Sequence, residues 1–387
     1  MATHSISGHR KTMWEIDRNG DTWIVKKNAT IETVDIAGIF EDQTFSGNII
    51  KVFGDITASG NSSGIALLGQ ASGSRVLVGA SATISSQYAI YATGDDHRFT
   101  IDGRLFGTEF GIEANGDNIH VTLGGRIFAG TGIFLHGRDL DVDIGKKGRI
   151  DALTGILTES DNRVEIVNKG IINTSGEAIR IADGLVEDGS AHIVNQGKIF
   201  GLVYLGAGDD VFDTRKGTVN SFVVGGDGDD EYLVSKANIQ LTEYAAEGND
   251  TVKSTVSYAL FDNFENLTLL GKKNIDGEGT GGSNILTGNK GQNTLLGFGG
   301  IDLLNGGKGN DTLDGSDDNV LDLYIFRRGT GDDTISLFED GVDDIGDIAV
   351  AQDGSDMLVT LLDGDSIRIR NFSAANFSSA DILFDFL

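Results

Sequence analysis

The feature that most constrains this chain is an internal repeat of about 22 residues that runs from residue 48 to residue 200. Each unit begins with a short segment built around one large apolar residue. Five successive units place it at Ile84, Leu105, Ile127, Ile150 and Ile172, in steps of 21, 22, 23 and 22 residues. A period this even indicates that every unit folds in the same way and stacks on the next.

Within each of these units a second apolar pair follows, and a polar turn closes the unit. The pairs are Ala89-Ile90, Gly111-Ile112, Gly132-Ile133, Gly155-Ile156 and Ala178-Ile179. Segments of alternating polarity, such as "HVTL" and "DVDI", lead into the next unit. Short strands joined by turns at this period predict an all-β fold, a right-handed parallel β-solenoid over residues 48–204. A helical solenoid would need a period of 3.6 residues, which the repeats lack.

Residues 1–47 do not follow this repeat and are expected to cap the first coil. They contain both tryptophans of the chain, Trp14 and Trp23, and the dipeptide Asn19-Gly20, which favours a hairpin. The segment "DRNGD" resembles the start of an EF-hand loop. Its glycine is misplaced and its twelfth position is Asn28 instead of Glu, so a simple turn is expected.

After residue 200 the turns become acidic and rich in glycine. Three segments, "LGAGDDVFD", "GGDGDDEYL" and "AAEGNDTVK", align at intervals of twenty residues. Their aligned acids are Asp210, Asp230 and Asp250, and their turn glycines are Gly206, Gly208, Gly226, Gly228 and Gly248. Twenty residues is close to the coil period, so residues 205–255 are expected to be solenoid coils whose acidic turns stack along one edge.

From residue 279 the period shortens to nine residues. Four units, "GTGGSNILT", "GNKGQNTLL", "GFGGIDLLN" and "GGKGNDTLD", have leucine at every eighth position. Their sixth residues are Asn284, Asn293, Asp302 and Asp311, and two looser units add Asp322 and Asp333 at eleven-residue steps. The turn glycines of the later units include Gly307, Gly309 and Gly331.

Each residue type in this pattern has a physical role. Glycine permits backbone torsions that a Cβ would forbid and lets carbonyl oxygens point into the turn. The sixth residue offers a side-chain oxygen at the start of a strand, and the eighth turns inward to the core. Stacked turns of this kind surround a gap with oxygens, which suits Ca²⁺ better than the tighter, water-retaining Mg²⁺.

These units resemble the RTX nonapeptide repeat, G-G-x-G-x-D-x-U-x, in which U is a large apolar residue. The resemblance covers residues 205–340, with the regular roll expected over 279–340. It implies a calcium-binding parallel β-roll in which each nonapeptide is half a coil, so that turns n and n+2 stack. It also implies a protein that is secreted through a type I exporter and folds on calcium outside the cell.

On this reasoning several calcium ions are each bracketed by two stacked turns. The expected pairs are Asp210/Asp230, Asp230/Asp250, Asp302/Asp322 and Asp311/Asp333. Sites that use Asn284 or Asn293 should be weaker or empty, because an amide is neutral. Val320 occupies the place that strict nine-residue spacing gives to an acid, and a two-residue slip restores the register at Asp322. The acids at position five, Asp209, Asp229 and Asp332, are expected to face solvent.

The composition narrows the choice of partners. The net charge of −28 and the pI near 4.4 disfavour nucleic acid and anionic lipid, while stacked carboxylates favour a divalent cation. The absence of cysteine excludes disulfides and thiolate metal sites. No stretch is long and apolar enough to predict a membrane span, and the first twenty residues lack the apolar core of a secretory signal.

Two further segments complete the expected organisation. Residues 256–278 resemble the linker that precedes RTX arrays. Residues 341–387 are expected to form a C-terminal hairpin, and Asp381–Leu387 pair acids with large apolar residues as in uncleaved type I secretion signals.

An enzyme is the less favoured alternative. "HExxH" is absent, and "GNSSG" at 60–64 lies in a polar turn, away from any strand-to-helix elbow. A polysaccharide lyase or epimerase built on a β-helix would need an acid, a base and a charge neutraliser on neighbouring coils. Six residues near equivalent turns are candidates: Asp95, His97, Arg98, His120, Arg138 and Asp139. No catalytic residue is assigned, because the coils are too compact for a substrate cleft. The expected function is an extracellular calcium-binding module that contacts a cell surface or polysaccharide.

Overall fold

The structure is a computed structural model of the 387-residue chain. It describes residues 1–42, 44–68, 72–160, 162–183, 189–316, 319–326, 331–336, 344–345, 349–353, 356–360 and 366–369. The chain divides into two compact units, Met1–Asp227 and Gly228–Leu387. The described parts contain strands and turns but no α-helix, which confirms the all-β prediction.

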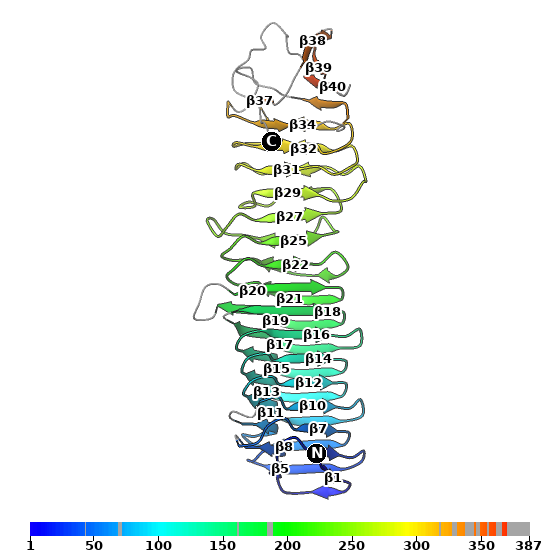
Figure 1. Cartoon of the computed structure of the whole chain (residues 1–387), viewed down its shortest axis with the longest axis vertical. Helices are drawn as coiled ribbons and strands as arrows, with labels where there is room; N and C mark the ends of the chain where they lie inside the picture. The colour runs from blue at the N-terminus through cyan, green and yellow to red at the C-terminus, as the bar shows by residue number, and fades with distance from the viewer. Residues whose placement is uncertain are drawn as a thin grey trace. The chain divides into compact units, whose positions relative to one another are not determined.

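The first unit is a parallel β-solenoid (Figure 1). One sheet is formed by strands that pair in parallel with their counterparts one coil away. Its strands are β1 (Thr3–Ile6), β4 (Thr22–Val25), β7 (Ile49–Val52), β10 (Arg75–Val78), β12 (Arg98–Ile101), β14 (His120–Leu123), β16 (Leu140–Ile144), β18 (Arg163–Asn168), β20 (Ser190–Asn195) and β22 (Val211–Asp213).

The facing sheet of the first unit includes five strands of 11 to 13 residues. Its strands are β2 (His9–Arg10), β5 (Thr30–Val34), β8 (Asp55–Ser59), β11 (Thr83–Thr93), β13 (Arg104–Asn115), β15 (Arg126–His136), β17 (Arg149–Ser160), β19 (Ile171–Asp183), β21 (Lys198–Tyr204), β23 (Thr218–Val219) and β24 (Phe222–Val224). The register shifts between β11 and β13 at Ser86/Tyr88, and between β13 and β15 at Gly107/Phe110. Short strands β3 (Trp14–Ile16), β6 (Ile39–Glu41) and β9 (Ser63–Leu67) pair in the early coils and lead into β11.

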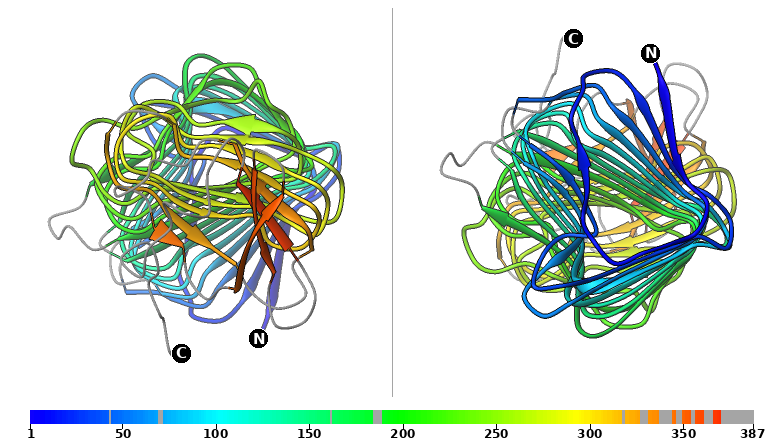
Figure 2. Two further views of the ribbon diagram at one scale, coloured as in Figure 1. Left: turned by 90° about the horizontal axis from the view of Figure 1, so that it is seen from above. Right: turned by 90° about the horizontal axis from the view of Figure 1, so that it is seen from below.

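The core of this unit consists of the predicted apolar columns. Ile84, Leu105, Ile127, Ile150 and Ile172 are partners in consecutive coils and are 0% exposed. Seen from below, the coils of this unit overlie one another around a common interior (Figure 2). Each fully buried isoleucine or leucine contributes roughly 1.5–3 kcal/mol through the hydrophobic effect, so the repeated columns account for the coil period.

The first 47 residues correct one prediction. Strand β4 pairs in parallel with β1 and β7, while β3 pairs in parallel with β6. The hairpin predicted at Asn19-Gly20 is therefore wrong, and this segment forms coils of the solenoid in place of a separate cap. Local turn chemistry suggested the hairpin, but the burial of Trp23 and Val25 in the core column (3% and 0% exposed) determines the fold.

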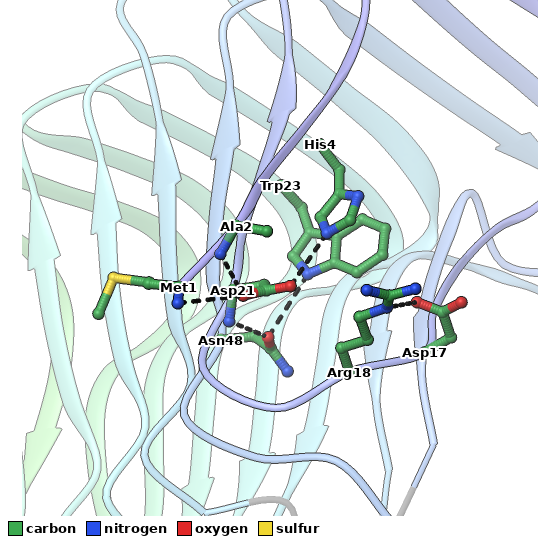
Figure 3. Close-up of polar contacts among 8 residues, drawn as sticks. All are labelled: Met1, Ala2, His4, Asp17, Arg18, Asp21, Trp23 and Asn48. Atoms are coloured by element: carbon green, nitrogen blue, oxygen red, sulfur yellow. Dashed lines mark hydrogen bonds and ion pairs between the residues drawn. The ribbon is translucent and has the colours of Figure 1, made fainter.

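At the N-terminal end Asp21 holds the first strand in place (Figure 3). Its Oδ1 accepts a hydrogen bond from the Ala2 amide, and its Oδ2 lies 3.0 Å from Nε2 of His4. The His4 ring stacks on Trp23 with centroids 4.1 Å apart. The backbone hydrogen bond from Ala2, followed by the contact with His4, lowers the pKa of Asp21.

The second unit is a parallel β-roll with shorter strands (Figure 1). One face contains β25 (Glu231–Val234), β27 (Thr251–Ser254), β29 (Asn266–Leu269), β31 (Ile285–Thr287), β33 (Leu303–Asn305), β35 (Leu323–Ile325) and β37 (Asp344–Ile345). The other contains β28 (Tyr258–Ala259), β30 (Gly277–Glu278), β32 (Thr294–Leu296), β34 (Thr312–Asp314) and β36 (Asp333–Ile335), and β26 covers Gln240–Thr242.

The register of the roll confirms the predicted half-coil. Leu286 pairs with Leu304, and Leu295 with Leu313, so that alternate nonapeptides stack. All four leucines are 0% exposed. Beyond β36 the pattern changes: β38 (Ala349–Asp353), β39 (Asp356–Thr360) and β40 (Ser366–Ile369) pair antiparallel, and β40 pairs parallel with β36.

Residues 256–278 correct a second prediction. Strand β29 pairs with β27 and β31, and β30 pairs with β28 and β32. The segment is therefore part of the stack and not a linker, because Phe264 and Leu267 (2% and 0% exposed) bury their side chains in the core. The predicted secretion signal, Asp381–Leu387, lies outside the described residues.

Candidate calcium centre

All the predicted sixth-position side chains are buried. The exposed fraction is 0–3% for each of Asp210, Asp230, Asp250, Asn284, Asn293, Asp302, Asp311, Asp322 and Asp333. The position-five acids Asp209, Asp229 and Asp332 are exposed, as expected. The sequence pattern therefore distinguishes an inward acid from the outward acid beside it.

The buried acids form a ladder in which each carboxylate accepts a hydrogen bond from the coil before it. In the second unit Oδ1 of Asp250 accepts from the Asp230 amide at 2.9 Å, and Oδ1 of Asp322 accepts from the Asp302 amide at 2.9 Å. On the other edge Oδ1 of Asp333 accepts from the Asp311 amide at 2.8 Å. The structure thus brings together three of the four predicted pairs.

The fourth predicted pair, Asp210/Asp230, is divided between the two units and stays a prediction. Within the first unit, Oδ1 of Asp210 accepts from the Ala191 amide at 2.6 Å, which places Asp210 in the same kind of ladder. One coil before Asp210, the same position of the coil is occupied by the buried, apolar Ala191.

One carboxylate oxygen shows the fit to a cation most directly. Oδ2 of Asp311 is buried and has no hydrogen-bond partner among the described residues. A Cβ on Gly306, the first glycine of the same repeat, would lie 2.4 Å from this oxygen. The missing side chain of Gly306 therefore leaves space beside the buried Oδ2 of Asp311. Carboxylates and turn carbonyls offer only oxygen ligands, which Ca²⁺ prefers.

Burial and like charge change the protonation of these acids. Burial, followed by the charge of Asp333, raises the pKa of Asp311 to about 7. Burial raises the pKa of Asp250 to about 6, and the nearby charges of Glu265, Asp229 and Glu247 add to the effect. Both acids are therefore poorly stabilised as anions until a cation compensates them.

The two asparagines are arranged differently from the aspartates. Nδ2 of Asn284 donates to the Phe264 carbonyl at 2.8 Å, and Nδ2 of Asn293 donates to the Ile275 carbonyl. The side-chain amides thus form hydrogen bonds to carbonyl oxygens that could otherwise coordinate an ion. This geometry supports the prediction that sites containing Asn284 or Asn293 are weak or empty.

The structure adds an acid that the sequence pattern did not include. Asp230, Glu243 and Asp250 are all buried, and one ligand atom from each lies within 4.8 Å of the others. Glu243 follows β26, and the hydroxyl of Tyr232 donates to its carboxylate. Glu243 lies at a strand end outside the nonapeptide pattern, so no repeat spacing identifies it in the sequence.

A second missed acid is Glu265, in the segment expected to be a linker. Its Oε2 accepts from the Asp250 amide at 2.7 Å, so it continues the ladder in the position of an aspartate. The coil between β27 and β29 advances by only 15 residues, from Thr251 to Asn266, which hid this alignment.

The turn glycines are required by close approach of the backbone. Gly309 has φ +131°, and a Cβ there would lie 2.2 Å from the Gly291 carbonyl oxygen. Gly331 has φ +116°, with the Gly309 carbonyl at 1.8 Å from such a Cβ. Carbonyls of one coil therefore point at the bare Cα of the next. The other predicted glycines with positive φ are Gly206, Gly208, Gly226, Gly228 and Gly307, and a Cβ on Gly248 would lie 1.9 Å from the Gly228 carbonyl.

Substitution of Gly309 tests this geometry. We expect Gly309→Ala to destabilise the roll by about 2–3 kcal/mol, because the new Cβ meets backbone and the torsion is strained. The matched control is Gly281→Ala, since a Cβ at Gly281 has no atom within 4 Å. Urea denaturation in calcium would measure both, and equal stability of the two variants would contradict the close-approach account.

The residues considered for catalysis do not converge. His97 is 0% exposed, and its ring nitrogens lie near the Thr93 and Ser74 carbonyls. Asp95 and Arg138 belong to a chain of hydrogen bonds that links successive turns. The Asp117 amide donates to the Asp95 carboxylate, and the Arg138 side chain donates to the Asp117 carboxylate. Arg98 and His120 pair on the outer face of β12 and β14. Asn162 donates to Asp139. In "GNSSG", Ser62 is buried and donates to the Ser59 carbonyl.

Comparison with known proteins agrees with the geometry. The family of the RTX calcium-binding nonapeptide repeat matches four copies, within residues 278–313 and 296–319. A parallel β-solenoid with buried, stacked acids at glycine-rich turns defines a class of calcium-binding repeat protein. The chain thus contains RTX calcium-binding repeats together with a β-solenoid region.

Two curated relatives come from Rhizobium meliloti (strain 1021). The chain is 34% identical over 186 residues to the endo-1,3-1,4-beta-glycanase EglC, covering 45% of this chain and 37% of that protein. It is 40% identical over 159 residues to the endo-1,3-1,4-beta-glycanase ExsH, covering 41% of this chain and 34% of that protein. The chain thus spans about a third of the length of these relatives. No helix long and apolar enough to cross a membrane occurs in the described residues.

Proposed function

We propose that this RTX-repeat protein folds on binding several calcium ions after export from the cell and then acts as an extracellular module that contacts polysaccharide. The observation that supports this most is the burial of stacked carboxylates in the roll. Like charges buried at this spacing are stabilised only when a cation lies among them. Extracellular calcium would bind the folded state preferentially and so stabilise it.

The ligands of each ion are part of the proposal. Asp302 with Asp322 and Asp311 with Asp333 would bracket ions in the roll, together with turn carbonyls. Asp230, Glu243 and Asp250 would surround a further ion. When bound, calcium would neutralise the buried charge and fix the turns that join successive strands.

Calcium titration of the chelated chain tests the proposal. We expect multi-site binding, and Glu243→Gln should weaken one site by roughly tenfold or more, because a buried charged ligand is lost. Glu231→Gln is the control, since Glu231 is paired with Lys253 and lies outside the buried group. An unchanged isotherm for Glu243→Gln would remove this residue from the site, and the absence of any calcium binding would refute the function.

Export by the type I pathway is the second part of the proposal. It is supported by the RTX repeats, which are typical of secreted proteins, and by the acid and apolar residues at 381–387. Removal of residues 381–387 is expected to retain the protein inside cells that carry the exporter. Normal export of the truncated chain, measured in the medium, would contradict this assignment.

An enzymatic role is the alternative, and the glycanase names of the two relatives favour it. The shared region covers only about a third of each relative, so it need not include their active sites. Release of reducing ends from a mixed-linkage glucan, or of unsaturated uronates from an acidic polysaccharide, would establish catalysis. Binding without product would favour the module.

A further inference from the structure

A stripe of basic side chains follows one edge of the solenoid in the first unit. Arg104, Arg126 and Arg149 begin β13, β15 and β17 and are partners in consecutive coils. The turns that precede β17 and β19 add Lys146, Lys147 and Lys169, all exposed. We call these six residues the basic stripe. Such a run of cations is unexpected in a chain with a net charge of −28.

The charges at the start of the stripe are only partly compensated within the protein, because the charge of Arg126 helps to lower the pKa of Asp151 without forming an ion pair with it. Arg149 pairs with Asp151 at 2.5 Å, but Arg104 and Arg126 form no ion pair with any residue that the structure describes. Asp102, in the turn that precedes Arg104, directs its carboxylate toward the next coil, where a Cβ on Gly124 would lie 2.5 Å from its Oδ1. Adjacent coils are about 4.8 Å apart, well within the screening length of about 8 Å, so neighbouring guanidinium groups repel each other.

Aromatic rings lie beside these arginines on the same outer face. Residues i and i+2 of a strand share a face, so Phe106 accompanies Arg104 and Phe128 accompanies Arg126. The two rings stack with centroids 5.0 Å apart and planes inclined by 7°. Phe106 is 39% exposed. Cation and ring therefore recur together in two successive coils.

We infer that the basic stripe and these two rings bind an acidic polysaccharide, a chain with one carboxylate or sulfate on every one or two sugars. This polysaccharide would be the ligand of the extracellular module proposed above, so its binding rests on that proposed function. Cations spaced by one coil match a linear chain of well-separated charges, and the rings suit the apolar sides of sugar rings. A nucleic acid duplex has one charge per about 1.7 Å, so the strongly acidic protein would repel it more.

The test uses the full chain in millimolar calcium at low salt, titrated with a fluorescent hyaluronan decasaccharide and with its uronate methyl ester. We expect the acid to bind and the neutral ester to bind at least tenfold more weakly. The double variant Arg104→Gln/Arg126→Gln should lose roughly tenfold in affinity, as expected for two exposed charge contacts. The matched control is Arg75→Gln/Arg98→Gln, which removes an in-register arginine pair from the other sheet.

Three results would overturn this inference: equal binding of acid and ester, equal loss for both double variants, or tighter binding of a DNA oligonucleotide or anionic vesicles. Calcium-dependent melting of each variant is measured in parallel. If melting depends on calcium and the decasaccharide does not bind, only this inference fails. If melting is independent of calcium, the proposed function itself fails.

Discussion

Chelation of calcium is expected to unfold the coils after about residue 205 while the coils before them stay folded. Without the ion the roll would bury ionised carboxylates side by side, since Asp302, Asp311, Asp322 and Asp333 are 0–3% exposed. Burying like charges side by side costs several kcal/mol, which is comparable to the whole stability of a domain of this size. At Asp311 the ladder hydrogen bond to Oδ1 leaves Oδ2 without a hydrogen-bond partner among the described residues.

The earlier coils differ at the same position of the coil. In the register of the first sheet, Ile119, Leu140, Val164 and Ala191 occupy the column that Asp210 enters one coil later. All four are buried and apolar, so these coils have no charge to neutralise. Their stability is expected to be independent of calcium.

Circular dichroism and hydrogen exchange with EDTA would measure this difference. Protection should be lost in the repeats and kept in β11–β19, and magnesium should restore little of it because it demands tighter geometry. If EDTA leaves both the spectrum and the melting temperature unchanged, the acids are stabilised by some other means, and the calcium account is wrong.

The sequence predicted the architecture well where residues repeat at a fixed spacing. The columns of Ile84 and Leu105 and of Leu286 and Leu304 follow directly from the period, because each inward residue has one counterpart per coil. The N-terminal coils and residues 256–278 were mispredicted because their steps vary. Strand β7 lies 27 residues after β4, whereas β29 lies 15 after β27. Burial of a few apolar residues maintains the stack there without a visible repeat.

The candidate site was predictable only in part, for a related reason. The nonapeptide pattern identifies an acid by its offset from glycines, and it therefore finds Asp302 and Asp311. It does not find Glu243 or Glu265, which approach the acids from a strand end and from an irregular coil. These contacts depend on which residues of neighbouring coils lie next to one another. The spacing of residues along the sequence does not show this.

Acidification is expected to weaken calcium binding and, in the absence of calcium, to stabilise the roll. In the folded chain burial raises the pKa of Asp311 to about 7 and that of Asp250 to about 6, whereas an unfolded aspartate titrates near 3.9. Between about pH 4 and pH 7 the metal-free folded state therefore binds more protons than the unfolded state. Its free energy of unfolding must then fall as the pH rises through this window.

Calcium reverses the trend because it binds only the deprotonated carboxylates. At pH 5.5 a group with a pKa of about 7 is mostly protonated, so the affinity of the Asp311 site should be about 30-fold lower than at high pH. Circular dichroism in EDTA should show the chelated roll regaining strand structure as the pH falls from 7.5 to 5.5, whereas urea denaturation in calcium should show its stability falling over the same interval. Asp311→Asn should flatten both pH dependences, while Asp229→Asn, at an exposed position, should leave them unchanged. A metal-free roll that gains stability from pH 5.5 to 7.5 would show that these buried acids are ionised without the ion.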